Sequence, residues 1–451
     1  MDLIKPLAQH IFIPLSYHRE GFDISARLGN LEESQYWSAD QIQHLQWRRL
    51  QHLLAEAYEH VPYYRELFDS EGIHPEDIRD DSDFRRVPML TKQDVRQQAD
   101  RLVSNRFSRG DLIPKKTGGS TGVPLKLFWS RNAATHKKAA TIRHDTWTGY
   151  RPGEKLAMLW GAEEGEDTWR YKVYNFLTLR RIALDTLMMD EEGTLAFLDR
   201  LRGYGARFLF GHAHSLYVLA QFLEERNIGD LPIESILSTA EVLTEQEREL
   251  IEKAFSAPVF DRYGCEELSI IASECEVHEG MHVHAEGLYV ELEGGNGDEP
   301  GDLIVTDLVN EAMPLIRYKT EDMALPMGGV CSCGRTLPRL KKVFGRHSDF
   351  LYTPEGRMLS GVSIMVNLAI EIPGIWQVQV VQDRLDHLLF RIVRTEQFGD
   401  HSLDMLTEAV PRFFGPLMRY DIEYVAALKR TPRGKYQFSI CNIEPPRQAG
   451  Q

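Results

Sequence analysis

Six consecutive residues at 117–122 have the composition of a phosphate-binding loop. Three glycines and three hydroxyl residues provide backbone N–H groups that can wrap phosphate oxygens. No Gly-Lys-Ser/Thr follows, and the next segment is predicted to be a strand, so this is not the loop of P-loop NTPases. A plain hairpin turn is the alternative interpretation. The six residues are Thr117, Gly118, Gly119, Ser120, Thr121 and Gly122.

Three shorter motifs carry side chains suited to nucleotide chemistry. In YGCEE at 263–267, Tyr263 could stack on a base, and Glu267 could hold Mg²⁺ on phosphates. Asp322 ends the strand-like run PLIRYKTED, where a carboxylate can accept hydrogen bonds from both ribose hydroxyls. Lys435 lies on the glycine turn RTPRGK, from which an ammonium can reach a phosphate. For each motif taken alone, an exposed polar turn is the alternative.

Three cysteines and one histidine indicate a metal site. Cys275 and His278 form one short pair, and Cys331 and Cys333 form another. Three thiolates and one imidazole make the ligand set of a closed, structural zinc site. His282 or His284 could replace His278, and four unrelated residues are the alternative. Cys265 and Cys441 are expected to be ordinary thiols.

Size and charge narrow the classes of protein to consider. A chain of 451 residues is expected to fold into two or three domains. The net charge of -15 argues against binding to nucleic acid or to an anionic membrane. No apolar run is long enough for a membrane span, and no signal-peptide pattern opens the chain. We therefore expect a cytoplasmic protein whose five cysteines are reduced.

The elements around these motifs form an α/β pattern. Ser38 and Gln41 predict a capped helix whose apolar face includes Leu50, Leu54 and Ala57. The glycine loop is flanked by two strands, and a helix is expected over 132–146. Thr244 and Glu247 predict a second capped helix, which is followed by a strand into YGCEE. Further strands are expected at 287–294 and 301–308.

The order of predicted strands and helices changes after residue 346, where a compact α+β pattern begins. The segments at 376–381 and 387–393 predict a hairpin, 402–413 a helix, and 422–428 a strand. We expect a large N-terminal domain of several subdomains over 1–346, which binds nucleotide and acid. A small α+β domain over 347–451 is then long enough to fold by itself and to act as a mobile lid.

Taken together, these motifs resemble the adenylate-forming superfamily of acyl-CoA synthetases. More closely, the chain resembles the phenylacetate–CoA ligase family and its capsule-biosynthesis-type relatives. The resemblance covers nearly the whole chain, and its combination of motifs is specific although each piece is not. The segments that carry it are WSADQIQHLQ, HVPYYRELF, VPMLTK, TGGSTGVPL, STAEVLTEQ, YGCEE, IVTDL, PLIRYKTED, CSCGRTLPRLKKVFGRHSDF and RTPRGK.

The resemblance implies a role for each motif. The glycine loop would hold the β- and γ-phosphates, Glu241 and Tyr263 the adenine, and Asp322 and Arg346 the ribose. Glu267 matches the magnesium-associated glutamate. Lys435 matches the mobile lysine that contacts the carboxylate and the α-phosphate. Two departures from the family pattern are Glu266, where Ser or Thr is common, and the segment 348–349, which leaves the hinge uncertain by one residue.

The implied activity is that of an AMP-forming ligase. A carboxylic acid, aryl or otherwise small, would react with ATP and Mg²⁺ to give an acyl-adenylate, and CoA would then take the acyl group. An amine, a carrier-protein thiol or AMP transfer are alternative fates of the activated group. A non-catalytic nucleotide-binding protein is disfavoured because Lys435 and Glu267 are both present. The segment 211–220 is expected to line the acid pocket, with a helix start capped by His214 or Ser215 as the alternative. A homodimer is compatible with the sequence.

Overall fold

The structure is a computed structural model that describes residues 2–116, 125–161, 168–186, 189–295, 299–346, 350–428 and 437–443. The chain forms two compact units. One contains Met1–Gly211, Asp230–Ala240 and Ser256–Val343. The other contains His212–Gly229, Glu241–Phe255 and Phe344–Gln451. The second unit therefore combines the C-terminal region with two helices from the middle of the chain.

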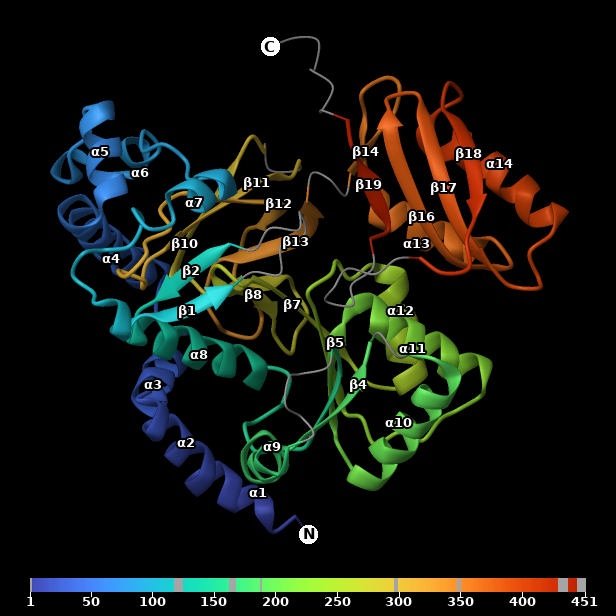
Figure 1. Cartoon of the computed structure of the whole chain (residues 1–451), viewed down its shortest axis with the longest axis horizontal. Helices are drawn as coiled ribbons and strands as arrows, with labels where there is room; N and C mark the ends of the chain where they lie inside the picture. Colours follow the sequence, from blue (N-terminus) through green and yellow to red (C-terminus); the bar gives the residue numbers. More distant parts are fainter. Residues whose placement is uncertain are drawn as a thin grey trace. The chain divides into compact units, whose positions relative to one another are not determined.

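The first unit opens with helices (Figure 1). Ser38 and Gln41 form the predicted capping box at the start of the longest of them, α4, and Leu50, Leu54 and Ala57 on its inner face are buried. Pro62 occupies the first turn of the next helix, α5, where a missing backbone N–H costs nothing. The helical segments up to β1 are α1 Ile4–Leu7, η1 Ala8–Phe12, α2 Ile13–Glu20, α3 Ile24–Ser34, α4 Ala39–His60, α5 Pro62–Glu71, η2 Pro75–Asp77, α6 Asp81–Phe84, α7 Lys92–Gln98 and η3 Arg109–Asp111.

Eleven strands of the described residues form one sheet in the order β10-β11-β12-β13-β9-β8-β7-β6-β5-β3-β4. The pairs β3–β4, β3–β5 and β6–β7 are parallel, whereas β7 through β13 pair antiparallel wherever a register is defined. The strands are β3 Leu156–Trp160, β4 Arg181–Asp185, β5 Phe208–His212, β6 Ser235–Thr239, β7 Val259–Cys265, β8 Ser269–Glu274, β9 Met281–Val283, β10 Leu288–Glu293, β11 Gly301–Asp307, β12 Tyr318–Met327 and β13 Arg339–Arg346.

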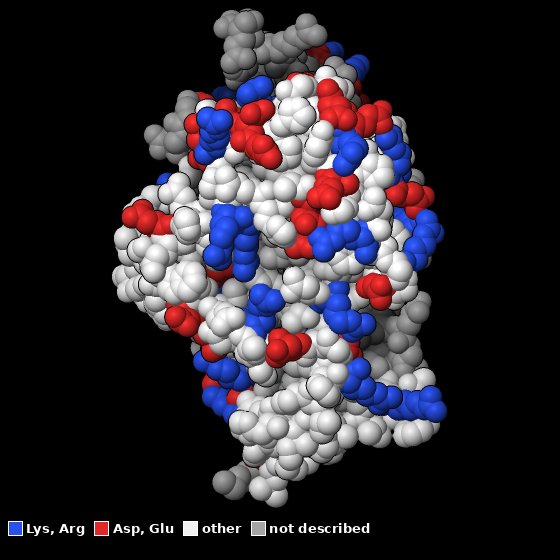
Figure 2. All heavy atoms as spheres, turned by 90° about the vertical axis from the view of Figure 1, so that its left-hand side faces the viewer, with Lys and Arg blue, Asp and Glu red and all other residues white. Residues whose placement is uncertain are grey.

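Helix α8 (Arg131–Thr146) packs on β8, and the expected helix over 132–146 is thus confirmed. It follows a hairpin of β1 (Ile113–Lys116) and β2 (Lys126–Trp129), the strands expected on either side of the glycine loop. The remaining helices of this unit are α9 Trp169–Tyr174, η4 Asn175–Leu179 and α10 Glu191–Tyr204. On the face in Figure 2, Lys and Arg are interspersed with Asp and Glu, so no large patch of one sign appears there.

The second unit has its own core. A four-stranded sheet, β18-β17-β16-β19, packs against α13 and α14 around Leu368, Phe390 and Phe414. The predicted hairpin is β16 with β17, and the predicted strand at 422–428 ends earlier, at Tyr424. The elements are α11 Ala213–Glu225, α12 Glu245–Phe255, β14 Phe350–Tyr352, β15 Met358–Ser360, α13 Gly361–Glu371, β16 Ile375–Arg384, β17 His387–Arg394, α14 Asp400–Phe414, β18 Arg419–Tyr424 and β19 Ser439–Cys441.

The predicted fold class, α/β with a small α+β C-terminal domain, is confirmed. Thr244 and Glu247 form the expected reciprocal cap of α12. No helix in the described ranges combines the length and the apolar character needed to cross a bilayer.

Candidate active site

Two predicted nucleotide residues in the first unit meet directly. The Tyr263 hydroxyl, near the end of β7, donates a hydrogen bond of 2.5 Å to Asp322 Oδ2 in β12. Burial, reinforced by the Asp322 charge, holds the pKa of Tyr263 well above its usual value. Tyr263 therefore stays a neutral donor, and its hydrogen bond fixes the orientation of the Asp322 carboxylate.

Glu267 lies in the same constellation. The residue is 7 % exposed, and its Oε1 accepts a 3.2 Å hydrogen bond from the hydroxyl of Tyr318, the first residue of β12. Burial is also the main reason that the pKa of Tyr318 is raised. The segments at 263–267 and 318–322 are thus held together by two tyrosine–carboxylate hydrogen bonds.

The backbone around Asp322 explains how this residue is presented. Asp322 lies inside β12 rather than at its end, and the pairing of β12 with β11 shifts register between Asp302 and Ile304. Next to that irregularity, Glu321 has a φ of 70°, in the left-handed region that a glutamate rarely adopts. Such irregularities redirect side chains beside functional sites. Here the kink directly precedes the carboxylate.

Glu241 has a different environment, in the second unit. Its Oε2 accepts a 3.0 Å hydrogen bond from the backbone N–H of His214, in the first turn of α11. A carboxylate is favourable at a helix N-terminus because the helix dipole is positive there. The helix begins after His212, whose own side chain makes no cap, so a cap by His214 or Ser215 is not what starts α11. His214 and Tyr217 are both buried.

Several predicted residues lie outside the described residues. These are Lys435 and the whole glycine loop, Thr117, Gly118, Gly119, Ser120, Thr121 and Gly122, together with the expected hinge at 348–349. For Arg346 the backbone is described at the end of β13, but the side chain is not.

The structure corrects the expected metal ligands. Cys275, Cys331 and Cys333 come together, and the histidine beside them is His282, the alternative that the sequence offered, and not His278. His278 lies 3.2 Å from Glu274 through Nδ1, and its ring packs on Phe260. All five cysteines belong to the described part of the chain, and each is free of disulfides.

Cavities lie among the described residues of the first unit. One of about 230 Å³ lies among β3, β5, β6 and α8 and contains the ion pair of Arg262 with Asp145, at 2.6 Å. Its other walls are largely apolar and aromatic: Thr141, Thr148, Tyr150, Leu156, Met158, Arg181, Phe208, Leu209, Phe210, Ser235 and Leu237.

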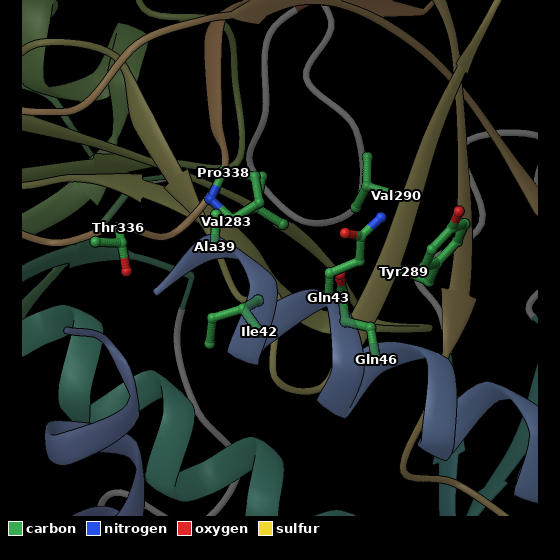
Figure 3. A pocket seen from close by; sticks show the side chains of 9 residues that line it. All are labelled: Ala39, Ile42, Gln43, Gln46, Val283, Tyr289, Val290, Thr336 and Pro338. Carbon is green, nitrogen blue, oxygen red and sulfur yellow. The ribbon is translucent and has the colours of Figure 1, made fainter. Parts of the chain in front are cut away.

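The other cavity, of about 300 Å³, lies beside the first turns of α4 (Figure 3). Ile42, Gln43 and Gln46 of that helix face Tyr289 and Val290 of β10 across it. None of the predicted nucleotide or metal residues lines it, and we assign it no ligand.

Sequence reasoning missed Tyr318 as a partner of the site. The sequence shows Tyr318 four residues before Asp322, but it does not indicate a role in the site, because a tyrosine in an apolar run usually packs in the core. Only the fold shows that its hydroxyl faces Glu267.

Comparisons with known proteins show what the chain is similar to. The CapK C-terminal domain family matches residues 351–442. Protein CapK of Staphylococcus aureus is 24% identical over 80% of this chain and 81% of its own length. Phenylacetate-coenzyme A ligase of Escherichia coli K12 is 28% identical over 70% of this chain and 73% of its own length. The chain is a homologue of CapK and of the phenylacetate–CoA ligases. The resemblance predicted from the sequence is thereby confirmed.

Solved structures place the fold in the same group. A 2-hydroxyisobutyryl-CoA ligase in complex with an acyl-AMP has a TM-score of 0.73 and 22% identity, over 90% of this chain and 91% of its own. An anthranilate CoA ligase bound to anthranoyl-AMP has a TM-score of 0.54 and 16% identity, over 74% of this chain and 66% of its own. The fold is therefore that of the acyl-CoA ligases.

Proposed function

We propose that the chain is an AMP-forming ligase that activates a small carboxylic acid with ATP and passes the acyl group to CoA. The observation that carries the proposal is the constellation of Tyr263, Asp322, Glu267 and Tyr318 in a homologue of phenylacetate–CoA ligases. It combines an aromatic ring for the base, a carboxylate for the ribose and a second carboxylate for Mg²⁺.

The chemistry assigns each group a task. An acid oxygen attacks the α-phosphorus, the bond to pyrophosphate breaks, and the acyl-adenylate forms; the CoA thiol then attacks the acyl carbon and releases AMP. Bringing a carboxylate to a triphosphate opposes two anions, and Lys435 with the N–H groups of 117–122 would offset that charge. Mg²⁺ would add positive charge at the phosphates, and the buried Glu267 carboxylate is an oxygen ligand that suits it.

We propose that the cavity beside Arg262 receives the body of the acid. About 230 Å³ is small for a ligand pocket, and its walls include the rings of Tyr150, Phe208 and Phe210. These properties favour an aryl or short branched acid over a long fatty chain. The segment 211–220, which the sequence predicts to line the acid pocket, contributes no residue to this cavity. Phe210, directly before that segment, does line it.

The remaining parts of the proposal follow from this activity. The domain over 347–451 would act as the mobile lid that carries Lys435, and the domain over 1–346 would bind ATP and the acid. The cofactors are ATP, Mg²⁺, CoA and a zinc ion that takes no part in the chemistry. We place the enzyme in the cytoplasm, where ATP and CoA are available and free cysteines stay reduced.

A screen of acid-dependent ATP–pyrophosphate exchange tests the proposal. Aryl, amino and short-chain acids are compared, and each active acid is then assayed for AMP release with and without CoA. We expect exchange with a small acid and thioester formation only with CoA. Exchange without thioester would point to an amine or a carrier-protein thiol as the acceptor. No exchange with any acid, in protein that binds ATP, would instead support a non-catalytic nucleotide-binding protein.

A further inference from the structure

Four side chains from two distant segments converge at one point of the first unit. Cys275 and His282 flank the turn between β8 and β9, whereas Cys331 and Cys333 lie on the loop before β13. Their sulfur and nitrogen atoms all lie within 4.8 Å of one another. Cys275, His282 and Cys331 are nearly fully buried, and Cys333 is partly exposed.

The spacing is that of ligands around a tetrahedral ion. Zinc bonds of about 2.3 Å to sulfur and 2.0–2.1 Å to nitrogen place two sulfurs about 3.8 Å apart and a sulfur about 3.6 Å from a nitrogen. Cys275 Sγ lies 3.8 Å from Cys331 Sγ, and Cys333 Sγ lies 3.4 Å from His282 Nε2. Two cysteines at 3.8 Å are not bonded as a disulfide, whose sulfurs would lie about 2 Å apart.

Neighbouring groups orient these ligands. His282 Nδ1 lies 3.4 Å from the carbonyl oxygen of Leu337, to which only a protonated nitrogen can donate. The lone pair of the imidazole is then on Nε2, which faces Cys333. The backbone N–H of Arg335 donates a 3.4 Å hydrogen bond to Cys333 Sγ. Orienting partners of this kind are typical of metal ligands.

We propose that Cys275, His282, Cys331 and Cys333 bind one zinc ion in a closed structural site. On binding, the three thiols release their protons to solvent, and the neutral imidazole binds through Nε2 without proton loss. Zn²⁺ with three thiolates carries one net negative charge, and Arg335 supplies a nearby cation. Four protein ligands leave no position for a substrate or a reactive water.

The ion would join two parts of the sheet region that sequence keeps apart. The β8–β9 turn follows, along β8, the segment that carries Tyr263 and Glu267, and the cysteine loop leads into β13. Zinc would therefore stabilise the strands behind the nucleotide site without touching ATP. The inference does not depend on the proposed ligase activity, since metal content is measured without a substrate.

Metal analysis of the full chain, purified without chelator or metal-affinity tag, tests the site. We expect about one zinc per wild-type chain. The zinc content should fall about tenfold in His282→Ala and in Cys333→Ser. The matched controls, His278→Ala and Cys441→Ser, should retain it. Equal zinc in His282→Ala and in wild type, or loss in His278→Ala but not in His282→Ala, would overturn the assignment.

A second measurement on the wild-type chain does not rely on variants that could fail to fold. Protein exchanged into Co²⁺ should show thiolate-to-cobalt charge transfer and the visible bands of tetrahedral cobalt. Mass spectrometry after native alkylation should show three cysteines protected with metal and modified once a chelator is added. A spectrum without thiolate bands, together with three thiols alkylated equally fast with and without chelator, would show that the cluster holds no metal.

Discussion

At the scale of the residue, hydrogen bonds from two tyrosines hold the carboxylates of the proposed nucleotide site. Asp322 and Glu267 are each held by a phenol, from Tyr263 and Tyr318. Both phenols are buried, and the pKa of each is raised, so they remain donors at neutral pH. The two carboxylates therefore keep fixed orientations before any ligand arrives.

Substituting Asp322 with Asn should weaken ATP binding. A hydrogen bond to a charged group contributes about 1.5–3 kcal/mol, which corresponds to a rise of roughly tenfold to a hundredfold in the KM for ATP. The KM for the acid should change little. Steady-state kinetics with each substrate varied in turn would measure both.

The neighbouring Glu321→Gln variant is the matched control, because Glu321 is half exposed and pairs with Lys92 at the surface. It should keep the wild-type KM for ATP. Equal effects of the two substitutions would mean that general charge, and not ribose contact, is responsible.

The family resemblance, and not residue types alone, indicates part of this candidate site. Tyr263, Glu267 and Asp322 were found because their motifs match a family order, although each motif is weak alone. His278 does not lie with the three cysteines, whereas the alternative His282 does. The sequence could not decide between them, because Cys-x-x-His spacing says nothing about strand register. In the structure, His282 in β9 lies opposite Ser273 in β8, which brings it to the end where Cys275 lies. The spacing within one short motif does not give the register of β8 with β9, which decides the histidine that faces the cysteines.

At the scale of the element, α8 brings an unusual number of polar groups into the core. His136, Arg143 and His144 are all buried on it. Arg143 pairs with Glu286 at 2.5 Å, His144 lies 2.9 Å from Arg143 and 2.6 Å from the Ser273 hydroxyl, and His136 lies 3.0 Å from His284. The helix is thus fastened to the strands by a network and not by an apolar stripe alone.

This network should make stability depend on pH. Burial holds the pKa of His136 and of His144 well below the ordinary value of 6.5, and nearby His284 and Arg143 add to the effect. Below pH 6.5 these two histidines bind protons in the unfolded chain but stay neutral in the folded chain. The free energy of unfolding should therefore fall as the pH drops below 6.5, by about 1.4 kcal/mol per pH unit for each of these histidines.

Denaturant unfolding at pH 7.5, 6.5 and 5.5 would measure this slope. His144→Gln should reduce it by about 1.4 kcal/mol per pH unit below pH 6.5. His52→Gln, which changes an exposed histidine, should leave it unaltered. A slope that is unchanged in His144→Gln would contradict the role of the α8 network.

The elements were easier to predict than the network. Caps, periodicity and turn residues located α4, α8, α12, the hairpin around the glycine loop and the C-terminal β16–β17 pair. The sequence of α8 has no apolar face, so the burial of its polar side chains could not be predicted from the sequence. Its partners Ser273, His284 and Glu286 are more than a hundred residues away in sequence.

At the scale of the whole molecule, the N-terminal helices leave an apolar stripe open. Leu3, Leu7, Ile11 and Leu15 are spaced four apart and are 42–72% exposed. The neighbouring η4 packs beside η1 and adds Phe176, which is 60% exposed. No acidic residue occurs between Leu3 and Arg19.

Apolar stripes of this size usually mark an interface, and we expect a second copy of the chain to cover this one. Within the stripe the charged side chains are basic, and the flanking Asp2 and Glu20 are paired with Arg180 and Lys138, so acidic repulsion between two copies is limited here although the chain as a whole carries -15. Light scattering after size exclusion should give a dimer for wild type and a monomer for Leu7→Ser with Ile11→Ser. A monomeric wild type, or a double variant that stays dimeric, would rule out this stripe as the dimer interface.

The central claim is that the acid attacks the α-phosphorus of ATP, and oxygen transfer tests it most directly. An acid that supports exchange is labelled with ¹⁸O in both carboxylate oxygens and incubated with the full chain, ATP, Mg²⁺ and CoA. The ¹⁸O content of the released AMP is then measured by mass spectrometry. Formation of an acyl-adenylate predicts one ¹⁸O in every AMP, because the bridging oxygen comes from the acid and leaves with the nucleotide. Unlabelled AMP, or labelled phosphate with ADP, would contradict the mechanism and the function proposed here.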